Sequence, residues 1–185
     1  MDLSRLLLLV FCMVASEVPD IQTRPIDFVC DDHARRDMNT VKELETAMND
    51  CSGSALLPSS IQLPCVKINK ASWEKKSMQE KRGDILAALG TLAQGVRVTR
   101  TLTTPGCQFS LLERLEHSIT NYLHIVTHLE LTGGAESPVT SCPSQDTQNL
   151  GQVLRHFSWL LTGKLEWLIA ELKSQCQTER LTSNL

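Results

Sequence analysis

The segment TLTTPGCQ, residues 101–108, separates two long amphipathic stretches, and its Pro105 and Gly106 are typical of the end of a helix. A helix of twenty residues is about 30 Å long, so a chain that travels back along it needs at least about 9 extended residues. A link of eight residues is too short for that journey. It can only turn back, which makes the two stretches antiparallel neighbours.

The other two links in the chain are long. Residues 50–72 and residues 132–148 are each enough to cross the length of a helix. The order long, short, long predicts an all-α, long-chain four-helix bundle with up-up-down-down topology and two crossover loops, as in growth-hormone and cytokine bundles. A simple up-down bundle would need three short loops instead.

Each of the four stretches carries an apolar stripe at the three- and four-residue spacing of a helix. The predicted stripes are Ala34, Met38, Val41, Leu44 and Met48 in the first; Ile85, Leu89, Leu92 and Val96, flanked by Leu86 and Ala93, in the second; Leu112, Leu115, Ile119, Tyr122, Val126 and Leu129 in the third; and Leu150, Leu154, Phe157, Leu161, Leu165, Leu168 and Leu172 in the fourth. Stripes of this width can close one shared core.

The first residues are typical of a secretory signal peptide. Arg5 precedes an apolar run over residues 6–14, and Ala15 and Ser16 are small enough for signal peptidase. The run is too short to span a bilayer. We expect a signal peptide over residues 1–16, with cleavage there or as late as about residue 23, and one domain over residues 24–185. The expected product is secreted, extracellular and not inserted in a membrane.

Six cysteines remain once Cys12 leaves with the leader, and six cysteines allow 15 pairings. The predicted topology narrows them. The start of the first helix and the end of the fourth share one end of the bundle, and the end of the first helix lies near the short turn at the other end. The expected bonds are therefore Cys30–Cys176 and Cys51–Cys107, which leaves Cys65–Cys142 by elimination.

Several function classes lack support in the sequence. The net charge of −3 gives no reason to expect nucleic acid as a partner. No phosphate-binding glycine loop or nucleophile elbow occurs. His117, His124 and His128 could together hold a metal, but they point away from the apolar stripe of the third helix and lack a completing carboxylate or cysteine. We expect no enzyme activity, no metal and no cofactor.

The fourth stretch has an unusual outward side. Trp159, Gly163 and Trp167 recur every four residues there, and Lys164 lies between that side and the core stripe. A glycine inside a helix costs about 1 kcal/mol relative to alanine. Two explanations stay open: the first crossover covers this side, or a protein partner binds it, since aromatic residues ringed by charge are typical of binding hot spots.

The chain resembles the erythropoietin and thrombopoietin cytokines. Four segments carry the likeness: Cys30 with Asp31; residues 66–69 through Trp73; residues 84–86 with Gly95 and Val96; and Leu161–Leu165. Within the family, thrombopoietin looks closer, because it pairs a cysteine ending the first helix with one just before the third. One position departs from the pattern: the arginine of the family's fourth helix is Thr162 here.

The resemblance implies a monomeric hormone that joins two class I cytokine receptor chains and so triggers Janus-kinase signalling. It implies a tight receptor face that uses Lys67, Asn69, Trp73, Gly163 and Lys164, to which helical periodicity adds Trp159. It implies a weaker face that uses Asp31, His33, Asp37, Arg114 and His117.

The expected receptor is that of thrombopoietin, and the expected role is to promote megakaryocyte and thrombocyte production. An erythropoietin-like hormone for red-cell precursors is the alternative within the family. A secreted helical carrier of lipid or another small ligand is the rival from a different class, and it would need a cavity in the core.

Overall fold

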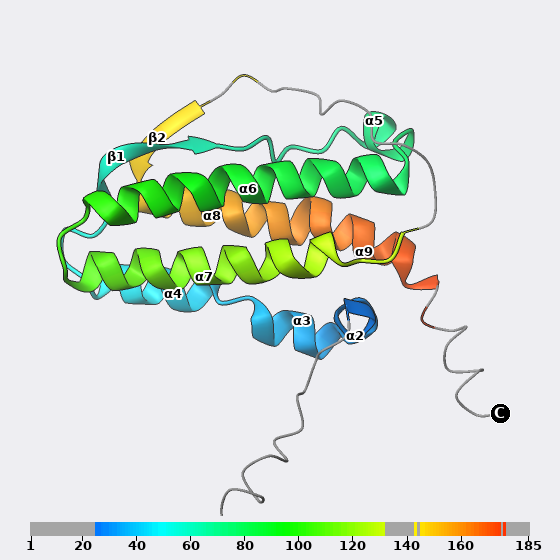
Figure 1. Cartoon of the computed structure of the whole chain (residues 1–185), viewed down its shortest axis with the longest axis horizontal. Helices are drawn as coiled ribbons and strands as arrows, with labels where there is room; N and C mark the ends of the chain where they lie inside the picture. The colour runs from blue at the N-terminus through cyan, green and yellow to red at the C-terminus, as the bar shows by residue number, and fades with distance from the viewer. Residues whose placement is uncertain (1–24, 132–142, 144, 175, 177–185) are drawn as a thin grey trace, which may run out of the picture.

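The computed structural model describes residues 25–131, 143, 145–174 and 176, and its long helices form a bundle (Figure 1). The elements, in chain order, are α2 (Pro25–Cys30), α3 (Asp32–Met38), α4 (Val41–Asn49), β1 (Leu56–Leu63), α5 (Lys70–Glu74), α6 (Met78–Leu102), α7 (Cys107–Thr127), β2 (Gln145–Asn149), α8 (Leu150–Leu160), the π-helix η1 (Leu161–Leu165) and α9 (Glu166–Leu172).

The helices have the predicted up-up-down-down order. In Figure 1, α4 and α6 run in one direction, whereas α7 and the run from α8 through α9 go the opposite way. A capping box fixes the start of α6, because Ser77 accepts a hydrogen bond from the backbone of Glu80 and the Glu80 carboxylate accepts one from the backbone of Ser77. The short link lies between α6 and α7, which pack side by side.

The predicted first helix is the part that differs from the structure. It is broken into α2, α3 and α4. Asp31 caps α3 through the backbone amides of His33 and Ala34, and the Asn39 side chain accepts from the amide of Val41. Such local hydrogen bonds compete with a continuous helix. The breaks change the helical phase, so Ala34 is exposed instead of buried.

The other predicted stripes form the core. Leu86 is half-buried, and so are Met38 and Met48 of the first stripe. The remaining residues of the second, third and fourth stripes are buried, as are Val41 and Leu44. At the centre, the ring of Tyr122 meets the rings of Phe28 and Phe157 edge to face, with centroids 6.0 and 5.8 Å away. Such aromatic pairs add to the stability that apolar burial supplies.

The two crossovers contact each other through an antiparallel ladder, which the sequence analysis did not anticipate. Ile61 of β1 pairs with Thr147 of β2, and Leu63 pairs with Gln145. Ile61 is fully buried against α6. A methyl group added at Gly95 of α6 would lie only 2.7 Å from Cγ2 of Ile61, so glycine allows this close approach of helix and strand.

Disulfides tie both ends of the bundle. Cys30 is bonded to Cys176, with Cα atoms 5.7 Å apart, and Cys51 is bonded to Cys107, with Cα atoms 6.1 Å apart. Both are pairs that the topology predicts. Cys65 is also disulfide-bonded, but Cys142, its expected partner, lies outside the described residues, as does the expected signal peptide. Within the described part of the chain, no helix combines the length and apolarity needed to cross a membrane.

Candidate protein-binding surface on the fourth helix

The fourth helix of the bundle is built from α8, η1 and α9, and its outward side carries two exposed tryptophans. Trp159 is 49% exposed and Trp167 is 38% exposed. The ring of His156 lies 5.1 Å from that of Trp159. Large apolar side chains left in water at helical spacing are a common feature of protein-binding surfaces. The two possibilities, cover by the first crossover or binding of a partner, apply to different residues of this side.

The first crossover covers the middle of this side, between the tryptophans. A methyl group added at Gly163 would lie 3.6 Å from Cδ1 of Ile68, which is ordinary contact. The Lys164 ammonium donates a hydrogen bond to the carbonyl oxygen of Cys65 over 2.8 Å. The crossover therefore covers Lys164 and contacts one side of Gly163, which stays half-buried, but it leaves Trp159 and Trp167 exposed.

Lys164 was expected to be a charged contact of the tight face, and its surroundings correct that expectation. Its side chain is only 7% exposed. Burial lowers the pKa of Lys164, an effect that the nearby Asp84 carboxylate partly offsets. Asp84 in turn forms an ion pair with Lys76. Lys164 thus holds the crossover in place rather than presenting its charge to a partner.

The structure also corrects the expectation for Trp73. It was expected on the tight face, but it is 3% exposed and belongs to the core. The Lys81 ammonium lies 5.8 Å from the centroid of its ring, and Lys81 also pairs with Glu171 at 2.7 Å. Trp73 therefore anchors the short helix α5 against α6 and α9.

The remaining predicted residues of the tight face are accessible. Lys67 and Asn69 are exposed on the crossover, and Gly163 is half-buried. Asn69 also caps α5, since its side chain accepts a hydrogen bond from the amide of Ser72 at 3.1 Å. An accessible surface made of Lys67, Asn69, Trp159, Gly163 and Trp167 remains, and we call it the tryptophan face.

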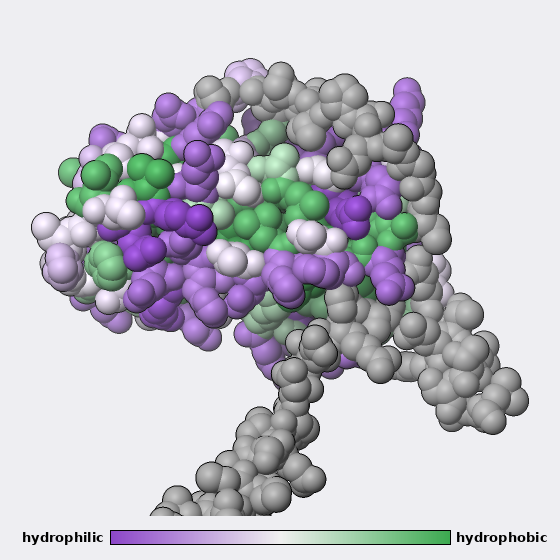
Figure 2. Space-filling view, in the orientation of Figure 1, coloured by the Kyte–Doolittle hydropathy of each residue, from purple (hydrophilic) through white to green (hydrophobic). Residues whose placement is uncertain are grey.

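The five residues predicted for the weaker face are all exposed and fall into two groups. Asp31, His33 and Asp37 lie on or beside α3, where Nδ1 of His33 is 2.8 Å from Oδ2 of Asp37. Arg114 and His117 lie on α7, and with Met38 and Thr40 they line a hollow between α7 and the break before α4. The front of α7 is largely hydrophilic (Figure 2). Asp31, His33 and Asp37 do not line this hollow.

The histidines of α7 remain on its surface. His117, His124 and His128 are exposed, and the rings of His124 and His128 lie 4.3 Å apart. Within the described ranges, no three histidine, cysteine or acidic side chains come together in a group that could hold a metal ion.

Comparison with known proteins identifies the family. A family model described as erythropoietin/thrombopoietin matches residues 27–179, which include α3 through α9 and all but the first two residues of α2. The chain belongs to the erythropoietin/thrombopoietin family. Members of this family are cytokine hormones and not enzymes, and its four-helix cytokine fold agrees with the bundle described above.

One relative within the erythropoietin/thrombopoietin family is an erythropoietin from Epinephelus coioides. It is 29% identical over 84 residues, a match that covers 45% of this chain and 44% of the relative. The chain therefore spans less than half the length of this relative.

Proposed function

We propose that this member of the erythropoietin/thrombopoietin family is a secreted haematopoietic hormone of the erythropoietin type. The observation that carries the proposal is the family match over residues 27–179, together with the likeness to the erythropoietin from Epinephelus coioides. Such a hormone would bind class I cytokine receptors and act on red-cell precursors. Its expected signal peptide, residues 1–16, would direct it out of the cell.

The tight receptor contact is proposed for the tryptophan face. Trp159 and Trp167 would be its anchors, since aromatic residues dominate binding energy at protein interfaces. Lys67 would contribute mainly to the rate of encounter, as exposed charges do. In this proposal Lys164 and Trp73 act through the crossover that they hold, because both side chains are buried.

A second, weaker receptor chain is proposed to bind a separate surface. Asp31, His33 and Asp37 beside α3, with Arg114 and His117 on α7, are its candidate residues. They lie on other elements than the tryptophan face, so one hormone could contact two receptor chains and bring their Janus kinases together.

A thrombopoietin-like hormone is the second candidate, and one specific observation favours it. The Cys51–Cys107 bond joins the end of α4 to the start of α7, which is the pairing that the resemblance associates with thrombopoietins. The small-ligand carrier has less support, because the leucines that face the core are almost completely buried.

The deciding experiment measures binding of the secreted protein to purified ectodomains of the erythropoietin and thrombopoietin receptors from one species. We expect tighter binding to the erythropoietin receptor and growth of red-cell colonies from marrow. Preference for the thrombopoietin receptor, with growth of thrombocyte precursors, would favour the second candidate. Binding to neither receptor would contradict both.

A further inference from the structure

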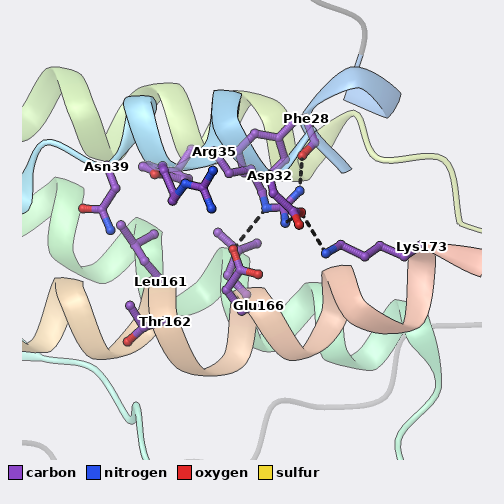
Figure 3. A pocket seen from close by; sticks show the side chains of 11 residues that line it. Phe28, Asp32, Arg35, Asn39, Leu161, Thr162, Glu166 and Lys173 are labelled. Atoms are coloured by element: carbon purple, nitrogen blue, oxygen red, sulfur yellow. Dashed lines mark hydrogen bonds and ion pairs between the residues drawn. The ribbon is translucent and has the colours of Figure 1, made fainter. Parts of the chain in front are cut away.

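A hollow of about 340 Å³ lies between α3 and the fourth helix. Side chains from α3 and from η1 and α9 point toward one another across it (Figure 3). Small-molecule sites begin at about this volume. Its lining includes apolar side chains from three elements of the bundle: Phe28, Tyr122, Leu161 and Leu165.

One end of the hollow is closed by a network around Arg35. The Arg35 guanidinium donates to the carbonyl oxygens of Phe28 and Val29 at 2.9 and 2.8 Å, and it pairs with Asp32 and with Glu166. Lys173 joins Asp32 at 2.8 Å (Figure 3). All the nitrogens of this buried guanidinium are engaged, so Arg35 is a structural clamp.

The other end of the hollow has no such bridge. Asn39 and Thr162 lie there (Figure 3), and each uses its side chain within its own segment: Asn39 accepts from the amide of Val41, and Thr162 donates to the carbonyl oxygen of Ser158. No hydrogen bond or ion pair between described residues joins α3 to the fourth helix at this end. A ligand could enter there without breaking one.

The lining also contains the hydroxyl group of Tyr122, a side chain that is otherwise buried. Tyr122 is 2% exposed, and its ring is fixed between Phe28 and Phe157. Its hydroxyl makes no hydrogen bond with any described residue. The hydroxyl oxygen is not among the fully buried unpaired atoms of the described residues, so it is open to the hollow that Tyr122 lines. A hydroxyl donor in the wall of a hollow, with no partner among the described residues, is available to a bound acceptor.

The charges around the hollow favour an anion. Three cations line it, Arg35, Arg36 and Lys173, against the two carboxylates of Asp32 and Glu166. Arg35 and Lys173 are taken up by ion pairs with those carboxylates. Arg36 is exposed and forms no ion pair with another described residue. One positive charge is therefore left at the hollow, beside apolar side chains.

We propose that this hollow binds a small amphipathic carboxylate. Its apolar body would lie on Phe28, Leu161 and Leu165, its carboxylate would pair with Arg36, and one of its oxygens would accept a hydrogen bond from the Tyr122 hydroxyl. The site needs no receptor, so it goes beyond the proposed hormone function and can be tested without it.

The test compares three probes of one shape: 3-phenylpropanoate, its neutral amide, and 3-phenylpropylamine. Calorimetry would measure affinity for the full protein, and amide NMR shifts would locate the site. We expect the carboxylate to bind about tenfold more tightly than the amide, the worth of one charge-assisted hydrogen bond, and the amine not to bind. The shifts should centre on Arg36, Asn39 and Thr162.

Matched variants decide which groups act. Arg36→Gln should weaken the carboxylate about tenfold and leave the amide unchanged. Tyr122→Phe should weaken both probes severalfold while the protein stays folded, because the hydroxyl has no partner within the described protein. Arg155→Gln, at an exposed arginine on α8, should change nothing. Equal binding of all three probes, no binding at millimolar concentration, or shifts elsewhere on the bundle would overturn the proposal.

Discussion

The ammonium of Lys164 lies 2.8 Å from the carbonyl oxygen of Cys65, a residue 99 positions earlier in the chain. The contact joins the π-helix of the fourth helix to the crossover that leaves the first. It sits between the two exposed tryptophans, so it sets where the crossover ends and the accessible surface begins. Changes at Lys164 should therefore act on the position of the crossover.

Replacing Lys164 with methionine tests this role, because methionine keeps the apolar stem and removes the donor. The Lys164→Met variant cannot donate the hydrogen bond to the carbonyl oxygen of Cys65. Loss of this bond should lower the free energy of unfolding by about 1–2 kcal/mol. Receptor dissociation should become faster. Urea unfolding and surface-binding kinetics measure the two effects. Lys67→Ala is the control: it should slow association, reduce its salt dependence and leave unfolding unchanged. Slower association of Lys164→Met with unchanged stability would contradict this role.

Gly163 and Gly95 lie in helical segments but have different neighbours. Gly163→Ala places a methyl group in ordinary contact with Ile68, so helix propensity should dominate and raise the unfolding free energy by up to about 1 kcal/mol. Gly95→Ala forces a methyl group against the buried Ile61, and overpacking should lower stability by about 1–2 kcal/mol. Thermal melts of the two variants should shift in opposite directions. Equal shifts would show that the close approach at Gly95 is not restrictive.

Trp159 and Trp167 should be anchors for the receptor while contributing little to folding. Each change to alanine should speed receptor dissociation about 30-fold, the effect of a hot-spot loss of 2 kcal/mol, with little change in the melting temperature. Leu102→Ala is a suitable control. Leu102 is 59% exposed at the α6–α7 end of the bundle, where apolar side chains gather at the left of Figure 2. If both tryptophan variants bind like the parent, the receptor uses another surface.

Tyr122 is the single tyrosine of the chain, which makes its titration easy to follow. Burial raises its pKa, and so does the Glu166 carboxylate, while Arg35 opposes them. The unfolded chain loses the phenolic proton near pH 10, but the folded protein keeps it, so stability should fall as the pH rises through about 10. The Tyr122→Phe variant should lack the part of this loss of stability that comes from ionisation of Tyr122. The measurements are tyrosinate absorbance and urea unfolding; ionisation near pH 10 in the folded protein would contradict the prediction.

The third disulfide can be settled chemically. We expect Cys65 to be joined to Cys142, since each belongs to one crossover and the crossovers pair through β1 and β2. Peptide mapping of the non-reduced secreted protein should recover these two cysteines in one cross-linked fragment. A fragment that joins Cys65 to any other cysteine would show that the elimination argument fails.

Loop lengths and apolar spacing were sufficient to predict much of this fold. The short link at Pro105 and Gly106 fixed the antiparallel pair of α6 and α7. The first helix was harder, because spacing assumes that a helix continues. Hydrogen bonds from the Asp31 and Asn39 side chains interrupt it, and the new phase buries Arg35 in place of Ala34. Capping residues inside an expected helix were the signal that could have indicated this.

The candidate site was predictable only in part. Periodicity correctly placed Trp159 and Trp167 outside the core, since that depends on one helix alone. It could not show that Lys164 and Trp73 are buried, because a crossover segment distant in sequence covers them. The pairing of β1 with β2 was missed for the same reason: its partners lie more than eighty residues apart. Non-local contacts of this kind leave no regular spacing in the sequence.

The π-helix η1 determines how the part of the fourth helix after Leu165 is rotated relative to the part before it. Phe157, Leu161 and Leu165 follow one another by two steps of four, which in a regular α-helix would turn the stripe by about 80°. The wider turn of η1 absorbs that rotation. If Leu161–Leu165 became a regular α-turn and kept all five residues, everything after it would rotate by about 80°. Leu168 and Leu172 would leave the core, Trp167 would leave the side of Trp159, and Cys176 would turn away from Cys30. The rotational phase of this one helix therefore determines which of its residues lie in the core, which are exposed, and whether Cys176 can bond to Cys30.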